Sequence, residues 1–252
     1  GGPAEGRFRN HGGVLKACRG FHLRVVDSEP GEKEIFEPIC QGMAQVGRAG
    51  GHALLWGDTT RSADNQEEQA KSLWEHYVSR GVSGVFFAPL ELTAGMREVN
   101  LWIADALEKA GIPVVLLDRD LVGFPDRSHF DLVGIDNRRA GYVMTAHLFS
   151  AGARRPAFLA RPRSGDTVEA RIAGYREALR SASAAELVFR GDPADTTFVS
   201  EIIKHQKPDA FFCANDDTAA HLMHTLDALS VRVPEQVRIA GVGDVKYASL
   251  LR

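Results

Sequence analysis

Four polar side chains stand shortly after apolar segments of this chain, and they are Asp118, Asn215, Asp216 and Asp244. A fifth group, the guanidinium of Arg171, lies near the start of an amphipathic segment. Carboxylates accept hydrogen bonds, an amide both donates and accepts, and a guanidinium donates from a planar fork. A sugar or similar polyol presents paired hydroxyls that donate and accept, so these residue types suit a pocket for a polyol.

The elements that must position these groups are expected to form parallel sheets. Continuously apolar segments alternate with amphipathic segments along the chain. This alternation is typical of parallel strands that helices cover on both faces, and the loops at the carboxyl ends of such strands collect ligand-binding groups. Strands are expected at residues 21–26, 53–56, 84–88, 113–117, 131–135, 157–160, 187–189, 209–213 and 237–242.

Helices are expected between most of these strands. Their ranges are about 33–48, 64–80, 99–109, 168–180, 196–205 and 216–229, and a further helical pattern begins after Asn137. In the first of these helices, Ile35, Ile39, Met43 and Val46 recur at helical spacing. This spacing predicts a helix over about residues 33–48 that ends at Gly50-Gly51.

The segment from Asp131 to Gly141 divides the chain into two halves. Its β-branched run stops at Asp136-Asn137 and turns directly into a helical pattern, after which the strand–helix alternation starts again. We therefore expect two α/β lobes with doubly wound parallel sheets, joined by a multi-stranded hinge, and a working cleft beside this crossing. The expected ranges are 21–136 with 243–252 for the N-terminal lobe, 137–242 for the C-terminal lobe, and 1–20 for a linker or tail remnant.

Composition and charge exclude several classes of function. The chain has 252 residues, of which 44% are hydrophobic and 25% are charged, as in ordinary globular proteins. A formal net charge of −3 argues against a nucleic-acid-binding module, which usually carries a basic excess. No apolar run reaches the roughly 18 to 20 residues that span a bilayer, and no secretory signal is visible in the first residues.

The cysteines and the remaining motifs give no sign of covalent chemistry. Cys18, Cys40 and Cys213 are odd in number and form no CxxC pair, which suits a reducing cytoplasm better than a disulfide framework. The chain lacks a GxGxxG after the first strand, a GxxxxGK[ST] and a GxSxG. Asp217 and His221 stand four apart with His224 nearby, which we interpret as a solvated helical face rather than a metal site.

Five motifs stand in a defined order in the sequence. They are Val133-Gly134-Ile135-Asp136-Asn137 with Ala140-Gly141 and His147-Leu148, then residues 170–175, residues 213–219, residues 233–237, and residues 239–244. Their order and spacing resemble the effector-binding core of LacI/GalR-type transcriptional regulators over roughly residues 21 to 252. The segment 35–39 is nearer to the subgroup whose core carries a winged-helix headpiece of the GntR type.

The resemblance implies a periplasmic-binding-protein-like fold of type I, a small effector between the lobes, and a homodimer formed through the core. It also implies that operator DNA is bound only through a headpiece absent from this chain, because the twenty residues before the first strand are too few and too rich in glycine to form one. The family normally continues past residue 252 with a strand and a helix that return to the first lobe.

The resemblance places Asp118, Arg171 and Asn215 among the effector contacts. Asp118 could instead be a cap or loop charge, and Arg171 could form a surface salt bridge with Glu169 or Glu177. Asn215 or Asp216 could simply cap the helix that follows, and Asp216 has this alternative in particular.

Asp244 is expected at the second crossing between the lobes. The family commonly has two consecutive acids here, whereas this chain has Gly243 in the first place. This difference implies a larger or differently substituted effector.

The other candidates are Asn137 at the crossing, where it can reach the effector, and Asp27, Phe36, Asp58 and Arg119 in the first lobe. Phe36 could stack on the apolar face of a sugar or act as a hydrophobic staple of its helix. Asp27 and Asp58 could merely solvate strand ends. Arg119 could pair with Asp120 or another surface acid.

These observations predict a sugar-sensing core of a cytoplasmic transcriptional regulator, with no cofactor, no metal and no membrane contact. The effector would favour one relative orientation of the lobes and so alter the spacing of the headpieces in a dimer. No enzymatic activity is expected. The alternative is a solute-binding protein of a sugar transporter, which would share the fold.

Overall fold

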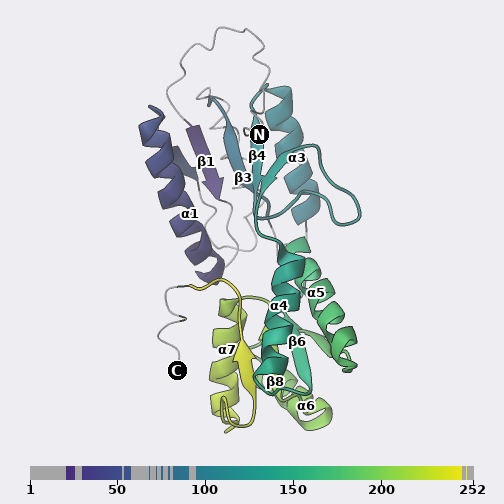
Figure 1. The fold of residues 1–252 in the computed structure, drawn as a ribbon. Helices are drawn as coiled ribbons and strands as arrows, with labels where there is room; N and C mark the ends of the chain where they lie inside the picture. Colours follow the sequence, from purple (N-terminus) through teal and green to yellow (C-terminus); the bar gives the residue numbers. More distant parts are fainter. Residues whose placement is uncertain are drawn as a thin grey trace, which may run out of the picture.

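The computed structural model describes residues 21–25, 30–52, 54–57, 82–90, 95–245 and 248, together with the single positions 68, 72, 75 and 79. Figure 1 shows two α/β lobes, one above the other, each built around its own sheet. Every strand pairing within the described residues is parallel. The expected fold class, with two parallel-sheet lobes, is therefore confirmed.

The first sheet contains five strands in the order β2-β1-β3-β4-β5. Their bounds are β1 Phe21–Val25, β2 Leu54–Gly57, β3 Val85–Ala88, β4 Val114–Leu117 and β5 Asp131–Val133. β3 and β4 are buried on both faces, which explains why their sequences are apolar without interruption. The strand order places the carboxyl end of β4, and with it Asp118, next to the exit from β5.

Two helices cover opposite faces of this sheet (Figure 1). α3 (Met96–Lys109) packs Val99, Ile103 and Leu107 against one face, in a cluster with Phe87 and Leu116. α1 (Pro30–Ala49) covers the other face. Most of the helix expected at 64–80 lies outside the described residues, and its four described positions are helical.

The helix expected at about 33–48 is present as α1, and it buries one of its apolar stripes. Phe36 and Cys40 are the residues that pack under the helix, whereas Ile39 is 39% exposed and Val46 is 74% exposed. Ile35 and Met43 also pack against this cluster, so the helical stripe 35-39-43-46 faces the core only in part. α1 has apolar residues on two adjacent stripes, and spacing alone does not distinguish a stripe that packs from one that lines a cavity.

The second sheet contains four strands in the order β7-β6-β8-β9. These strands are β6 Pro156–Ala160, β7 Val188–Arg190, β8 Ala210–Cys213 and β9 Arg238–Ala240. α4 (Asn137–Ser150) and α5 (Asp166–Ala182) cover one face, and α6 (Thr196–Gln206) and α7 (Asp216–Ala228) cover the other.

α4 and α5 cross at very short range. A Cβ built on Gly141 would lie 2.0 Å from the carbonyl oxygen of Arg171, and one built on Gly174 would lie 1.9 Å from that of Arg138. Real Cβ atoms do not approach backbone so closely, so only glycine permits this crossing. The two glycines therefore fix how α5, which carries Arg171, sits against α4.

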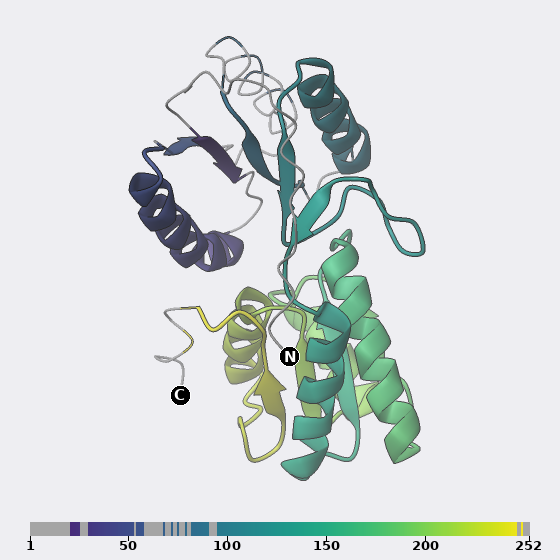
Figure 2. The same cartoon turned by 45° about the horizontal axis from the view of Figure 1, so that its top comes forward.

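The lobes are joined where β5 leads into α4, as Figure 2 shows. Asp136 caps α4 by accepting a hydrogen bond from the backbone N–H of Arg139 at 2.9 Å. Gly134 packs against Asp118, since a Cβ at this position would lie 3.0 Å from the carbonyl oxygen of Asp118. The second expected crossing, residues 241–245, follows β9 and reaches toward α1.

Two further predictions concern the boundaries of the lobes and the third crossing between them. The exact lobe boundaries at 136–137 and 242–243 remain a proposal, although each sheet lies wholly on its expected side of them. The third crossing, expected after residue 252, lies outside the described residues. Within the part of the chain that the structure describes, no helix combines the length and the apolar character needed to span a membrane.

Candidate ligand-binding site

A pocket of about 400 Å³ opens between the two lobes. This volume lies within the range of small-molecule sites. Residues from both lobes and from both crossings line it: Ile35, Ile39, Asp118, Arg119, Ile135, Thr167, Val168, Arg171, Asn215, Val242, Gly243 and Asp244. The pocket thus brings together five of the ten side chains expected to bind a ligand.

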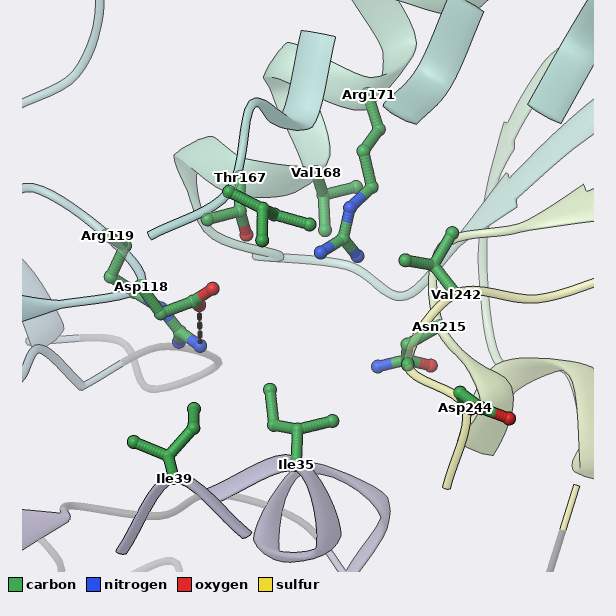
Figure 3. Close-up of a pocket in the computed structure, with 12 residues that line it drawn as sticks. Ile35, Ile39, Asp118, Arg119, Thr167, Val168, Arg171, Asn215, Val242 and Asp244 are labelled. Atoms are coloured by element: carbon green, nitrogen blue, oxygen red, sulfur yellow. Dashed lines mark hydrogen bonds and ion pairs between the residues drawn. The ribbon is translucent and has the colours of Figure 1, made fainter. Parts of the chain in front are cut away.

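Asp118 and Arg119 form one end of the pocket (Figure 3). Asp118 follows β4 with a φ of 68°, in the left-handed region. Its carboxylate accepts hydrogen bonds from Nη2 of Arg119 at 2.9 Å and from Nε at 3.1 Å. Arg119 is 7% exposed and Asp118 is 14% exposed, so the pair is largely buried. The alternative in which Arg119 pairs with Asp120 at the surface is wrong, because Asp120 accepts backbone N–H groups instead.

Arg171 projects from α5 into the pocket from the opposite wall. It is 8% exposed, and its Nε donates to Oδ1 of Asn137 at 2.8 Å while Nη1 donates to the carbonyl oxygen of Ala214 at 2.5 Å. The surface salt bridges considered for this residue do not form, since Glu169 pairs with Arg190 and Glu177 pairs with Arg138.

Asn137 does not line the pocket, although it had been expected to reach an effector. Its side chain is buried between Arg171 and the first crossing. Besides accepting from Arg171, it donates from Nδ2 to the carbonyl oxygen of Ile135 at 3.4 Å. Its position therefore suits orienting Arg171 better than contacting a ligand.

Asn215 and Asp216 have different roles. Asn215 caps α7, because its Oδ1 accepts from the backbone N–H of Thr218 at 2.8 Å, and its amide nitrogen is directed into the pocket (Figure 3). Asp216 is buried outside the pocket lining. Its Oδ2 accepts from the backbone N–H of Val245 at 3.1 Å, so it holds the second crossing instead of capping the helix.

Asp244 lines the pocket from the second crossing, where it is exposed and has a φ of 53°. Gly243 before it has a φ of 141°, a conformation that favours glycine. A Cβ built there would lie 3.2 Å from Oδ2 of Asp216 and 3.5 Å from Cγ2 of Ile35. The absence of a side chain at this position therefore leaves open the space beside Ile35.

Of the remaining first-lobe candidates, Phe36 lies outside the pocket lining, and two are not among the described residues. Phe36 is 3% exposed and packs with Cys40, Ala88 and Leu117, so its ring is not available to stack on a ligand. This position reflects the period of α1, in which residue 36 points to the sheet while residues 35 and 39 point to the cleft. Asp27 and Asp58 lie outside the described residues.

Sequence reasoning missed the aliphatic lining of the pocket. Five branched side chains contribute to it: Ile35, Ile39, Ile135, Val168 and Val242. In sequence they were assigned only to helices, to the first crossing or to a strand end, without a role in a site. The signal that distinguishes Ile35 and Ile39 is their offset by one position from Phe36 and Cys40, which places two apolar stripes on α1.

A buried ion pair lies outside the pocket lining, at the end of β6. Arg161 Nη2 and Asp217 Oδ2 are 3.1 Å apart, and Asp217 is 9% exposed. The interpretation of a solvated helical face is therefore wrong for Asp217, while His221 and His224 are exposed. Among the residues that the structure describes, no group of three or more potential ligands could hold a metal ion.

The polar groups of the pocket can donate and accept hydrogen bonds to a ligand. It offers two carboxylates, two guanidiniums and an amide on an aliphatic background. Cys213, the nearest thiol in sequence to Asn215, is fully buried, and this burial raises its pKa well above the ordinary value, which keeps it protonated and unreactive.

Comparison with known proteins agrees with this geometry. A family model for the periplasmic binding protein-like domain matches residues 145–252. The transcriptional repressor PurR of Vibrio atlanticus is 26% identical over 220 residues, which cover 84% of this chain and 62% of the repressor. The chain thus spans less than two thirds of the length of this relative.

Solved structures show the same architecture. The transcription regulator CcpA of Lactococcus lactis superposes with a TM-score of 0.74 at 20% identity, covering 92% of this chain and 82% of the other. The complex of the regulator CelR with cellobiose gives a TM-score of 0.73 at 24% identity, covering 92% and 70%. With the parallel sheets and the pocket between the lobes, these similarities show that the chain has a periplasmic-binding-protein-like fold.

Proposed function

We propose that this chain is the effector-sensing core of a DNA-binding transcriptional regulator and that its effector is a sugar or sugar derivative. One observation carries the proposal: Asp118 and Arg119 from one lobe face Arg171 and Asn215 from the other across a single pocket, which Asp244 lines from the second crossing. Carboxylates, guanidiniums and an amide can together satisfy hydroxyls that donate and accept. The regulators PurR and CcpA support the same class of function, and the cellobiose bound to CelR supports a sugar.

The proposed mechanism is a population shift. A ligand that contacts Asp118 on one lobe and Arg171 on the other stabilises the lobe orientation in which both contacts are made. In a homodimer this shift changes the distance between two headpieces that bind operator DNA, and so changes operator affinity. The headpiece, whether of the GntR type or another, the homodimer and a cytoplasmic location all belong to the proposal.

The core itself is proposed to catalyse no reaction. Its pocket holds no thiol or serine nucleophile among the described lining residues. Proteins similar to it favour regulation over solute transport, because PurR is a transcriptional repressor by name and CcpA of Lactococcus lactis is a transcription regulator by name.

The test is calorimetric titration of the 252-residue chain with a panel of pentoses, hexoses and their glycosides. At least one sugar is expected to bind, and Arg171→Ala is expected to abolish that binding. Arg190→Ala provides the matched control, because Arg190 is a surface arginine in the same lobe whose partner is Glu169. A chain that stays folded and binds no member of the panel would contradict the proposed function.

A further inference from the structure

Ile35 and Ile39 form an aliphatic wall on one side of the pocket. Figure 3 shows the two side chains projecting from α1, with the polar groups placed around the other sides. Ile39 is 39% exposed although isoleucine usually lies inside a protein. The two isoleucines thus present an apolar surface to the pocket, beside its polar groups.

The space next to this wall is kept open by Gly243. A side chain there would project between Ile35 and Asp216, to which a Cβ would come within 3.5 Å and 3.2 Å. The backbone φ of 141° disfavours any other residue at this position. Val168 and Val242 line the same pocket and add to its aliphatic character.

The charged and amide groups of the pocket lie on other sides of it than the two isoleucines. Asp118 and Arg119 stand at one end, Asn215 and Asp244 stand at the other, and Arg171 lies across from the isoleucines (Figure 3). A ligand whose hydroxyls meet these polar groups therefore presents its remaining edge to Ile35 and Ile39. A hydroxyl on that edge would lose water and gain no hydrogen bond from the two isoleucines, which is costly.

We infer that the effector is a polyol with an apolar substituent, either the methyl group of a deoxy sugar or the alkyl or aryl group of a glycoside, and that Ile39 is a specificity-determining residue. This inference rests on the proposed function and adds to it the class of sugar. The apolar substituent packs on α1 while the hydroxyls bind the polar groups of both lobes. Ile39→Thr keeps the β-branched shape and replaces the apolar ethyl group of isoleucine by a hydroxyl.

The experiment compares matched pairs of sugars by calorimetry on the 252-residue chain. The pairs are L-rhamnose with L-mannose, L-fucose with L-galactose, and phenyl with methyl β-D-glucopyranoside. In at least one pair the member with the larger apolar group is expected to bind about tenfold or more tightly, as one hydrophobic group in an apolar pocket allows. In Ile39→Thr this preference is expected to disappear.

The control variant is Val46→Thr. Ile39 and Val46 both lie on α1 and both border a separate apolar groove of about 740 Å³, but only Ile39 lines the pocket between the lobes. Val46→Thr is therefore expected to keep the preference, and thermal unfolding should show both variants folded.

The other outcomes distinguish a failure of the inferred apolar substituent from a failure of the proposed sugar-sensing function. If sugars bind but the more hydroxylated member of each pair binds equally well or better, the inference is overturned while the proposed function stands. A preference that survives Ile39→Thr also overturns the role of the wall. If no sugar of either kind binds, the proposed function fails and the inference fails with it.

Discussion

Nε of Arg171 donates a hydrogen bond to Oδ1 of Asn137 at 2.8 Å, and Nδ2 of Asn137 donates in turn to the carbonyl oxygen of Ile135 at 3.4 Å. The three residues connect the pocket with the crossing between the lobes. A ligand that accepts a hydrogen bond from the guanidinium of Arg171 therefore contacts a group that is itself hydrogen-bonded to Asn137, the first residue of α4. Asn137 contributes by orienting Arg171, without lining the pocket.

Asn137→Ala is expected to weaken effector binding about tenfold, because a hydrogen bond that orients a charged group contributes roughly 1.5 to 3 kcal/mol. Asn137→Asp keeps an oxygen at the same place and should retain most of the affinity. Calorimetry with the sugar found in the screen measures both. Equal affinity in the alanine variant and the natural chain would show that Arg171 needs no such support.

Asp118→Ala is expected to affect both binding and stability. Arg119 is 7% exposed and would lose the carboxylate that it now contacts at 2.9 Å, at a cost of about 1 to 3 kcal/mol in the free energy of unfolding. Asp118→Asn keeps one oxygen acceptor and should destabilise the protein less. Urea unfolding measures the stability. A variant that loses binding with unchanged stability would mean that Arg119 finds another acceptor.

Gly141→Ala is expected to destabilise the second lobe by at least 1 to 3 kcal/mol, because its Cβ would meet the backbone of Arg171 at 2.0 Å. It should also weaken effector binding, since Arg171 is displaced with that backbone. Gly42→Ala is the control: no atom lies within 4 Å of the Cβ it would add, and alanine in an exposed helix should stabilise by roughly 0.5 to 1 kcal/mol. Urea unfolding of the two variants should therefore give shifts of opposite sign.

The buried phenol of Tyr175 is expected to make the protein lose stability at alkaline pH. Its burial raises the pKa of the phenol from 10.0 to about 12, because the anion would be desolvated among Phe158 and the neighbouring core. The folded state therefore holds the proton more tightly than the unfolded state. The resulting stabilisation is complete below about pH 10 and is lost as the pH rises through about 12.

The measurement is the free energy of unfolding in urea between about pH 9 and 12. Tyr175→Phe should be less stable at neutral pH, because the backbone N–H of Leu187 loses the hydroxyl that accepts its hydrogen bond at 3.1 Å. It should also show a shallower decline with pH. Tyr142→Phe, at a tyrosine that is 41% exposed, should keep the natural slope. Identical slopes in all three proteins would contradict the assignment to Tyr175.

Strands and their parallel pairing could be predicted from the sequence because a strand that is buried on both faces is apolar at every position. β4 and β8 are uninterrupted apolar segments, and both are central strands of their sheets. The face of α1 could not be predicted in the same way. Ile39 and Cys40 are equally apolar, and only the position of the second lobe decides that one faces the cleft and the other the sheet.

The polar residues of the pocket could be predicted because the carboxyl ends of parallel strands meet at one edge. Asp118 follows β4 and Asn215 follows β8, and both line the pocket. The partners of the neighbouring residues could not be predicted. Asp216 differs from Asn215 by one position, yet its carboxylate binds the backbone of residue 245, a contact that depends on how the crossing returns.

That contact determines where the lobes can turn. The backbone N–H of Asp216 donates to the carbonyl oxygen of Val242, and its carboxylate accepts from Val245, so residues 242–245 are fastened to the start of α7. On the other connection, Asn137 is fastened to α5 through Arg171. On the first connection, the residues around Gly134 and Ile135 are therefore the ones left to change conformation when the second lobe rotates, and Arg171 and Asn215 move together toward or away from Asp118.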